Sequence, residues 1–232
     1  MDEYHHSLRL RAIELLLVTS VAFAGPIFSS IYELLSSRPS QAPETLRVLV
    51  FYGLIYEVLA IAVLAYVLFR QGRGFSQLGL AFNWKDIPVS ILLSIVSTFA
   101  FYLCYVLLAR SHHSVMGQTE DSAAQAQTYL DAGLAIGSIL FVVVNPFYEE
   151  LIVRAYIMSE VKDLTGSGAL AIIMSVGIQI LYHLYQGVAA AISLGMGFLV
   201  FALYYVRYRR ITPVILAHLY LDALALWTSS RH

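Results

Sequence analysis

Two adjacent carboxylates and a guanidinium lie inside an apolar run in the second half of the chain. Glu149, Glu150 and Arg154 belong to the stretch 145–158, whose other residues are mostly hydrophobic. A charge at the centre of a membrane-spanning helix costs about 2.5–3.5 kcal/mol on insertion scales, and such residues usually mark function. The i, i+4 spacing predicts that Glu150 and Arg154 pair and neutralise each other, mainly as a structural element. Glu149 is then left without a local cation and is the residue available for chemistry.

Other ionisable side chains lie in later apolar segments. His183 stands alone in one of them, and His218 in another is followed four residues later by Asp222, so that these two share a helix face. Polar groups buried in lipid should face the bundle interior and one another. We therefore expect these residues to converge with Glu149 on one polar site. Two histidines and a carboxylate could also hold zinc with an open position for water.

Pro146 precedes Glu149 by three residues. Because proline has no backbone N–H, it cannot donate to the carbonyl of Val142, and we expect the helix to kink or loosen where the carboxylates begin. The freed carbonyl could accept a water or a substrate amide, but an ordinary kink in a membrane helix explains the same residue.

The composition places these residues in a membrane protein. Of the 232 residues, 59% are hydrophobic and only 12% are charged, and the mean hydropathy is +0.73. A spanning helix needs about 20 largely apolar residues. The stretches that qualify are 12–35, 47–69, 87–108, 134–161, 169–185, 188–206 and 211–227. The sequence thus predicts an all-α, polytopic transmembrane helix bundle of about seven spans, a single membrane domain over residues 1–232 with its motif-bearing core at about 134–227.

Charge and cysteine content narrow the possible partners. The net charge of -1 and the scattered basic residues give no sign of nucleic-acid binding. Cys104 is the only cysteine, which excludes a disulfide within the chain and a multi-cysteine metal site. We expect the lipid bilayer as the surroundings of the chain.

The loop charges predict the orientation. With the N-terminus inside, the cytoplasmic segments hold nine Lys and Arg and the opposite side holds four, so the N-terminus is expected in the cytoplasm. The first stretch also resembles a signal peptide, with arginines before an apolar core and the small residues Ala22 and Ala24 at a would-be cleavage site. Because Glu14 interrupts that core and apolar sequence continues over 27–35, we favour a retained helix, kinked near residues 25–26.

Three motifs occur in the order of a known family. They read Glu149-Glu150-x-x-x-Arg154, a single His183, and His218-x-x-x-Asp222. This order and spacing resemble the CAAX protease and bacteriocin-processing (CPBP, or Abi) family of intramembrane endopeptidases, which includes the eukaryotic type II CAAX prenyl endopeptidase. The resemblance covers roughly residues 134–227. Any one motif is weak alone, whereas three in order on three apolar helices are fairly specific.

The chain departs from the family pattern at three positions. The family often has Phe before the motif arginine and Gly after it, where this chain has Val153 and Ala155. It often has Phe four residues before the middle histidine, where Gln179 places a polar amide near the site. Asp222 replaces the commoner Asn of the third motif and adds a potential charge.

The resemblance implies a role for each motif residue. Glu149 would be the general base that, with His183, polarises a water for attack on a peptide carbonyl. His218 and Asp222 would hold the developing oxyanion. The family has been discussed both as metalloproteases and as metal-independent glutamate proteases, and we expect the metal-free mechanism, with no cofactor, and keep zinc as the alternative. The resemblance also implies a multi-pass protein of a prokaryotic cell membrane.

The sequence is also compatible with functions other than proteolysis. The same fold could act as an immunity or scaffold protein that binds a partner in the membrane. The buried carboxylates could instead relay protons in a small-molecule conduit. A peptidase should lose nearly all turnover without Glu149, whereas an immunity or scaffold protein should not need it.

Overall fold

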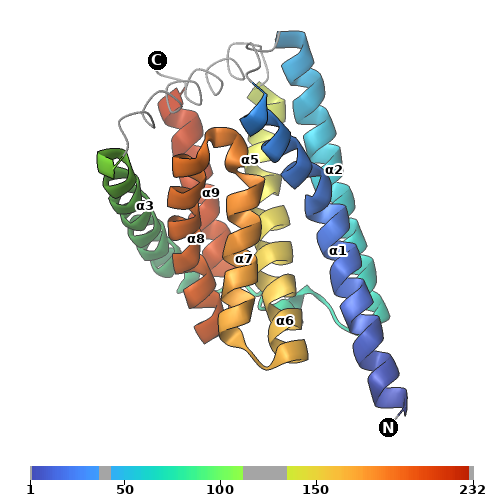
Figure 1. Cartoon of the computed structure of the whole chain (residues 1–232). Helices are drawn as coiled ribbons and strands as arrows, with labels where there is room; N and C mark the ends of the chain where they lie inside the picture. The colour runs from blue at the N-terminus through green and yellow to red at the C-terminus, as the bar shows by residue number, and fades with distance from the viewer. Residues whose placement is uncertain (1, 37–42, 112–134, 230–232) are drawn as a thin grey trace.

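The computed structural model describes residues 2–36, 43–111 and 135–229, and these contain helices and no strand (Figure 1). The prediction of an all-α bundle is therefore confirmed. The α-helices are α1 (Asp2–Leu35), α2 (Pro43–Arg70), α3 (Asp86–Ser111), α5 (Ala135–Glu149), α6 (Met158–Thr165), α7 (Gly168–Tyr182), α8 (Val188–Tyr208) and α9 (Thr212–Ser229). Short 3-10 helices η1 (Phe75–Leu78) and η4 (Leu184–Gln186) follow α2 and α7, and a π-helical segment, η3 (Glu150–Ile157), joins α5 to α6.

Four segments of the described helices are long and apolar enough to cross a membrane: Leu8–Leu35, Phe51–Arg70, Asp86–Leu108 and Val188–Tyr208. The apolar helices α7 and α9 are shorter, and the expected span 134–161 is divided among α5, η3 and α6. The sequence therefore located the helices of the bundle, but three of the seven expected spans are shorter or interrupted.

The α5–η3 rod lies in the middle of the bundle (Figure 1). It packs against α2 on one side and against α7 and α9 on the other, and every residue of η3 is buried. Helix α3 lies at the periphery, where it packs on α8 and α9. Only 11% of its apolar window is buried, so most of its apolar side chains are available to lipid. The central position of η3 places the charged motif of the sequence in the core.

Helix α1 supports the end of α5. It continues through Pro26 as one helix and changes direction toward its C-terminal end (Figure 1), as expected where proline removes a backbone hydrogen bond. Ala22 and Phe23 are fully buried, and the Tyr148 hydroxyl donates to the Ala22 carbonyl. Tyr148 directly precedes Glu149, so this contact ties the start of the charged motif to α1.

A tight contact between the connection after η1 and the α8–α9 turn fixes the beginning of α9. Gly79 has φ +86°, and a Cβ there would collide with the backbone carbonyl of Arg209. The Ile211 N–H donates to the Gly79 carbonyl over 3.2 Å, and the Ala81 N–H donates to the Thr212 hydroxyl over 3.0 Å. Because His218 lies less than two turns further on, this contact also sets the depth of the histidine.

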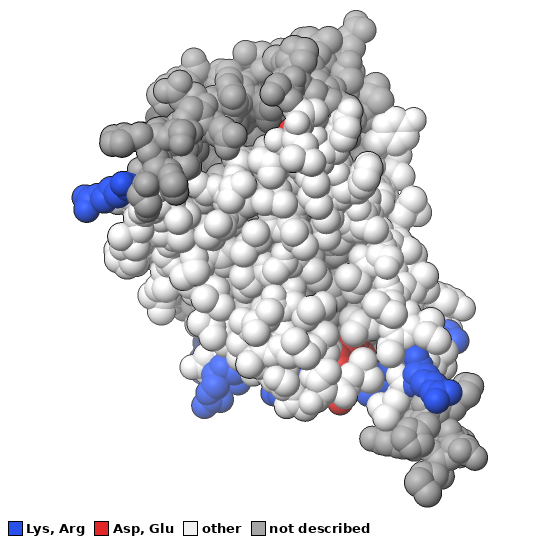
Figure 2. Space-filling model, viewed as in Figure 1, with Lys and Arg blue, Asp and Glu red and all other residues white. Residues whose placement is uncertain are grey.

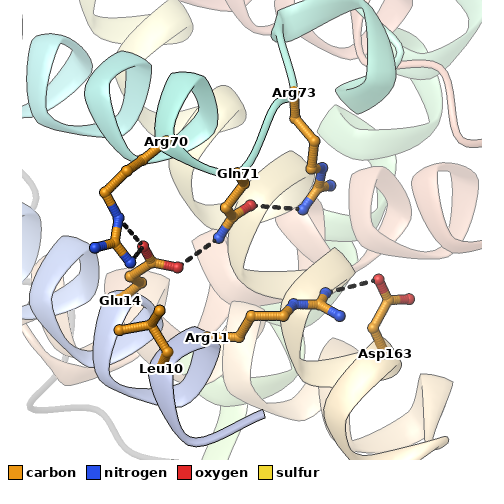
Figure 3. Close-up of a pocket in the computed structure, with 7 residues that line it drawn as sticks. All are labelled: Leu10, Arg11, Glu14, Arg70, Gln71, Arg73 and Asp163. Carbon is orange, nitrogen blue, oxygen red and sulfur yellow. Dashed lines mark hydrogen bonds and ion pairs between the residues drawn. The ribbon is translucent and has the colours of Figure 1, made fainter. Parts of the chain in front are cut away.

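Charged side chains gather at the end of the bundle where α1 begins (Figure 2). Arg11 of α1 donates to Glu160 of α6 over 2.9 Å and to Asp163 over 3.0 Å, and Arg73 also donates to Glu160. Glu14 is similarly held by side chains that follow or end α2 (Figure 3). This network links α1, the end of α2 and α6, and therefore fixes the N-terminal helices to the rod that carries the motif.

Glu160→Gln is expected to destabilise the fold by about 2 kcal/mol, because hydrogen bonds to charged groups contribute about 1.5–3 kcal/mol each and the two arginines are partly exposed. Thermal unfolding in detergent micelles measures the change. The matched control is Asp163→Asn, since the Asp163 side chain is 45% exposed and its ion pair with Arg11 is a surface contact. Equal losses for both variants would contradict the central role of Glu160.

Candidate active site

The two adjacent carboxylates lie where the central rod changes its helical geometry. Glu149 is the last residue of α5, and Glu150 is the first of η3. Both are buried, with 1% and 0% of their surface exposed. Segments of π-helix are rare and occur frequently at functional sites. Pro146 lies inside α5, and the predicted loosening of the helix begins four residues after it.

Glu149 is held by two amides. Gln179 of α7 donates from Nε2 to Glu149 Oε2 over 2.6 Å. Asn145, with its amide nitrogen turned toward the carboxylates, donates to Glu149 Oε1 over 3.2 Å. In the part of the chain that the structure describes, no Lys or Arg forms an ion pair with Glu149, as the sequence predicted. Gln179, the departure from the family pattern, thus contacts the proposed base directly.

Glu150 has two partners on different helices. Its Oε2 lies 3.4 Å from Arg154 Nε, which confirms the predicted i, i+4 pair. Its Oε1 lies closer to another group, 2.8 Å from His218 Nδ1 on α9. The prediction that Glu150 and Arg154 simply neutralise each other is therefore incomplete, since Glu150 also orients a histidine of the third motif.

Arg154 is fully buried and rests on an aromatic ring. Its guanidinium carbon lies 4.5 Å from the centroid of Phe198 on α8, a cation–π distance. Its three nitrogens have no hydrogen-bond acceptor among the described residues. Glu150 and Phe198 therefore offset the cost of burying the Arg154 charge, and the loss of either partner should lower the stability of the fold.

The two motif histidines flank the same phenylalanine. The ring of His183, at the C-terminal end of α7, lies 5.7 Å from that of Phe198, and the ring of His218 lies 5.3 Å from it on α9. His183 Nδ1 lies 2.8 Å from the Gln179 carbonyl. Because a carbonyl only accepts, this contact requires Nδ1–H and leaves Nε2 with its lone pair. His183 is thus oriented as a hydrogen-bond acceptor.

His218 lies between two carboxylates. Its Nδ1 faces Glu150, and its Nε2 lies 3.5 Å from Asp222 Oδ1, one turn further along α9. This arrangement suits a ring that donates from both nitrogens. Asp222, with 27% of its side chain exposed, is more open than the buried Glu149, His183 and His218. The structure therefore brings all three motifs into one buried cluster and leaves it most accessible near Asp222.

Residues 131–224 match a family model described as type II CAAX prenyl endopeptidase Rce1-like. Over these residues, the chain is similar to the CAAX protease family. The matched residues include all three motifs, so the resemblance seen in the sequence is confirmed. Neither a curated protein nor a solved structure matches the chain. The apolar helices and this match together indicate an integral membrane protein.

Sequence reasoning missed one carboxylate of this candidate site. Glu57, in the middle of α2, is 3% exposed, and its Oε1 accepts a hydrogen bond from Asn145 over 3.0 Å. It also interacts electrostatically with Glu149, Asp222 and His218. A single acidic residue in an otherwise apolar span was a sufficient signal, because its insertion cost is the same as that of Glu149.

Glu149, Glu150 and His218 could gather around a metal ion, since their ligand atoms lie within 4.8 Å of one another. This group differs from the two-histidine set that the sequence allowed, because it contains Glu150 and lacks His183. Zinc would take these oxygen and nitrogen ligands and activate a bound water. Arg154, however, already places a buried positive charge 3.4 Å from Glu150, and this charge opposes a second cation.

Proposed function

We propose that this chain is an intramembrane endopeptidase that hydrolyses a peptide bond of a membrane-associated protein or peptide with water activated by Glu149 and His183. One observation carries the proposal: a buried carboxylate, held by two amides and without an ion pair to any described Lys or Arg, lies in a cluster with two oriented histidines. The Rce1-like family match supports the same reaction class.

The proposed reaction needs one water and returns its proton. Glu149 removes a proton from the water, whose oxygen bonds to the peptide carbonyl carbon. His183 Nε2, left as an acceptor, orients the same water. The C–N bond of the tetrahedral intermediate then breaks, and Glu149 gives the proton to the leaving nitrogen. The products are one carboxyl terminus and one amine terminus.

The oxyanion of the intermediate is assigned to the His218 side of the site. His218 offers an N–H group at Nε2, and Glu150 holds the other ring nitrogen so that the ring cannot turn away. Donors fixed in a water-poor site stabilise developing negative charge strongly, because they need no reorganisation during the reaction. Asp222, at the more open edge, would meet the incoming substrate beside His218.

The charge distribution supports a cytoplasmic N-terminus. Most Lys and Arg of the face in Figure 2 lie at the end where α1 begins, and the positive-inside rule assigns such an end to the cytoplasm. We propose that the protein is a multi-pass protein of a prokaryotic cell membrane in this orientation. Its substrate would then reach the site from within the bilayer, as a membrane-associated peptide or protein.

Cleavage of a peptide library by the protein in proteoliposomes tests this proposal. We expect products that mass spectrometry identifies as pairs with a new carboxyl and a new amine terminus. Metal analysis of the same active preparation is expected to find less than stoichiometric zinc, with activity retained after chelation.

Two controls make the cleavage result specific. Liposomes with Glu149→Ala should give no products, and liposomes with Glu33→Gln, which changes an exposed acid of α1, should cleave as the wild type does. No cleavage by the wild type above the Glu149→Ala background would contradict the peptidase proposal. Stoichiometric zinc that is lost together with activity would instead establish the zinc-dependent version of the same reaction.

A further inference from the structure

Glu57 is a buried acid outside the matched Rce1-like region. It is the only acidic residue in the candidate span Phe51–Arg70, and 3% of its surface is exposed. Burial of a carboxyl group is costly unless hydrogen bonds or charges compensate it. Glu57 forms no ion pair with a described Lys or Arg, and its Oε2 has no hydrogen-bond partner in the described chain. Any contribution of Glu57 to the fold therefore comes through the one hydrogen bond that it forms with a described residue.

The one hydrogen bond that Glu57 forms with a described residue connects it, through Asn145, to Glu149, the proposed base. Asn145 donates from its amide nitrogen to Glu57 Oε1 over 3.0 Å and to Glu149 Oε1 over 3.2 Å. A primary amide has two N–H groups, one for each carboxylate. Helices α2 and α5 pack against each other, which holds the three residues side by side. Asn145 thus forms a bridge between Glu57 and Glu149.

We infer that Glu57 is a positioning residue of the peptidase site, which acts on Glu149 through Asn145; this inference rests on the proposed function. An asparagine amide can present either its nitrogen or its oxygen to a neighbour. Glu57 accepts from the nitrogen and so prevents the turn that would place the Asn145 oxygen against Glu149. Gln179 donates to Glu149 Oε2 and Asn145 donates to Glu149 Oε1, so hydrogen bonds hold both carboxylate oxygens in place.

The inference predicts a specific pattern of kinetic losses. Glu57→Ala and Asn145→Ala should each lower kcat about 10- to 100-fold with KM unchanged, by analogy with the loss found when hydrogen-bond partners that orient metal ligands are removed. The double variant should lose no more than the worse single variant, because both changes break one bridge. Glu57→Gln should restore most of kcat, since the glutamine oxygen can accept from Asn145.

Tyr56→Phe is the matched control. Tyr56 neighbours Glu57 on α2 and donates to the Val21 carbonyl of α1, so the variant removes a hydrogen bond of the same helix away from the site. It should leave kcat unchanged. Wild-type kcat in Glu57→Ala, or a loss in the double variant equal to the product of the single losses, would overturn the inference.

Thermal unfolding of the wild type, Glu57→Ala, Asn145→Ala and the double variant separates this inference from the proposed function. If the bridge exists, the decreases in Tm of Glu57→Ala and Asn145→Ala are not additive in the double variant, whether or not the protein cleaves a peptide. Additive decreases would refute the bridge. A wild type that cleaves nothing but shows a non-additive Tm cycle would refute only the peptidase proposal.

Discussion

Glu149→Gln is expected to lower kcat for peptide hydrolysis by about 10³-fold, within the range that general acid–base catalysis contributes. Glutamine preserves the shape of the side chain and can still accept from Gln179, which donates over 2.6 Å in the wild type. It cannot accept a proton from water. The variant should therefore fold and insert normally while the chemical step fails. Steady-state kinetics in proteoliposomes, with a Tm measurement on the same preparation, test both parts of this expectation.

The same variant separates the classes of function. A scaffold or immunity protein should keep its biological function with Glu149→Gln, because the buried surface and the fold are unchanged. Glu33→Gln removes a carboxylate from the exposed surface of α1 and should leave kcat at the wild-type level. Unchanged hydrolysis in Glu149→Gln would assign the base to another carboxylate of the cluster.

Hydropathy predicted the helices well because a backbone surrounded by lipid must form its hydrogen bonds internally. Each unpaired backbone group in the membrane is costly, so an apolar run of sufficient length forms a helix. The helical geometry of the span at 134–161 was harder to predict, since η3 adopts π geometry over Glu150–Ile157. The wider turn depends on the packing of surrounding helices, and Pro146, which lies before it, indicated only that the helix would loosen.

The motifs predicted which residues converge, but not which atoms meet. Adjacent residues on a helix point about 100° apart, so the sequence could not decide which of Glu149 and Glu150 faces each histidine. In the structure Glu150 faces His218, and Glu149 faces Gln179. Glu57 was missed because it lies in a span without a motif. Whether the motif residues act as the resemblance implies is still a prediction.

Arg154→Met is expected to destabilise the protein by about 3–5 kcal/mol, because removal of one partner leaves the other as an uncompensated buried charge. Glu150 would retain only His218, 2.8 Å from its Oε1. Thermal unfolding in lipid nanodiscs measures the loss. Arg207→Met is the matched control: that guanidinium also covers a ring, 5.3 Å from the Tyr208 centroid, but the residue is exposed and its loss should change Tm little.

The double variant Glu150→Gln/Arg154→Met distinguishes folding from catalysis. Removal of both charges together should restore most of the stability, since neither is then left unpaired in the core. It should not restore kcat, because a neutral amide replaces the carboxylate that orients His218 at Nδ1. If the double variant recovers both Tm and kcat, Glu150 serves the fold alone. If it recovers Tm only, Glu150 contributes to the stability of the bundle through Arg154 and to the reaction through His218.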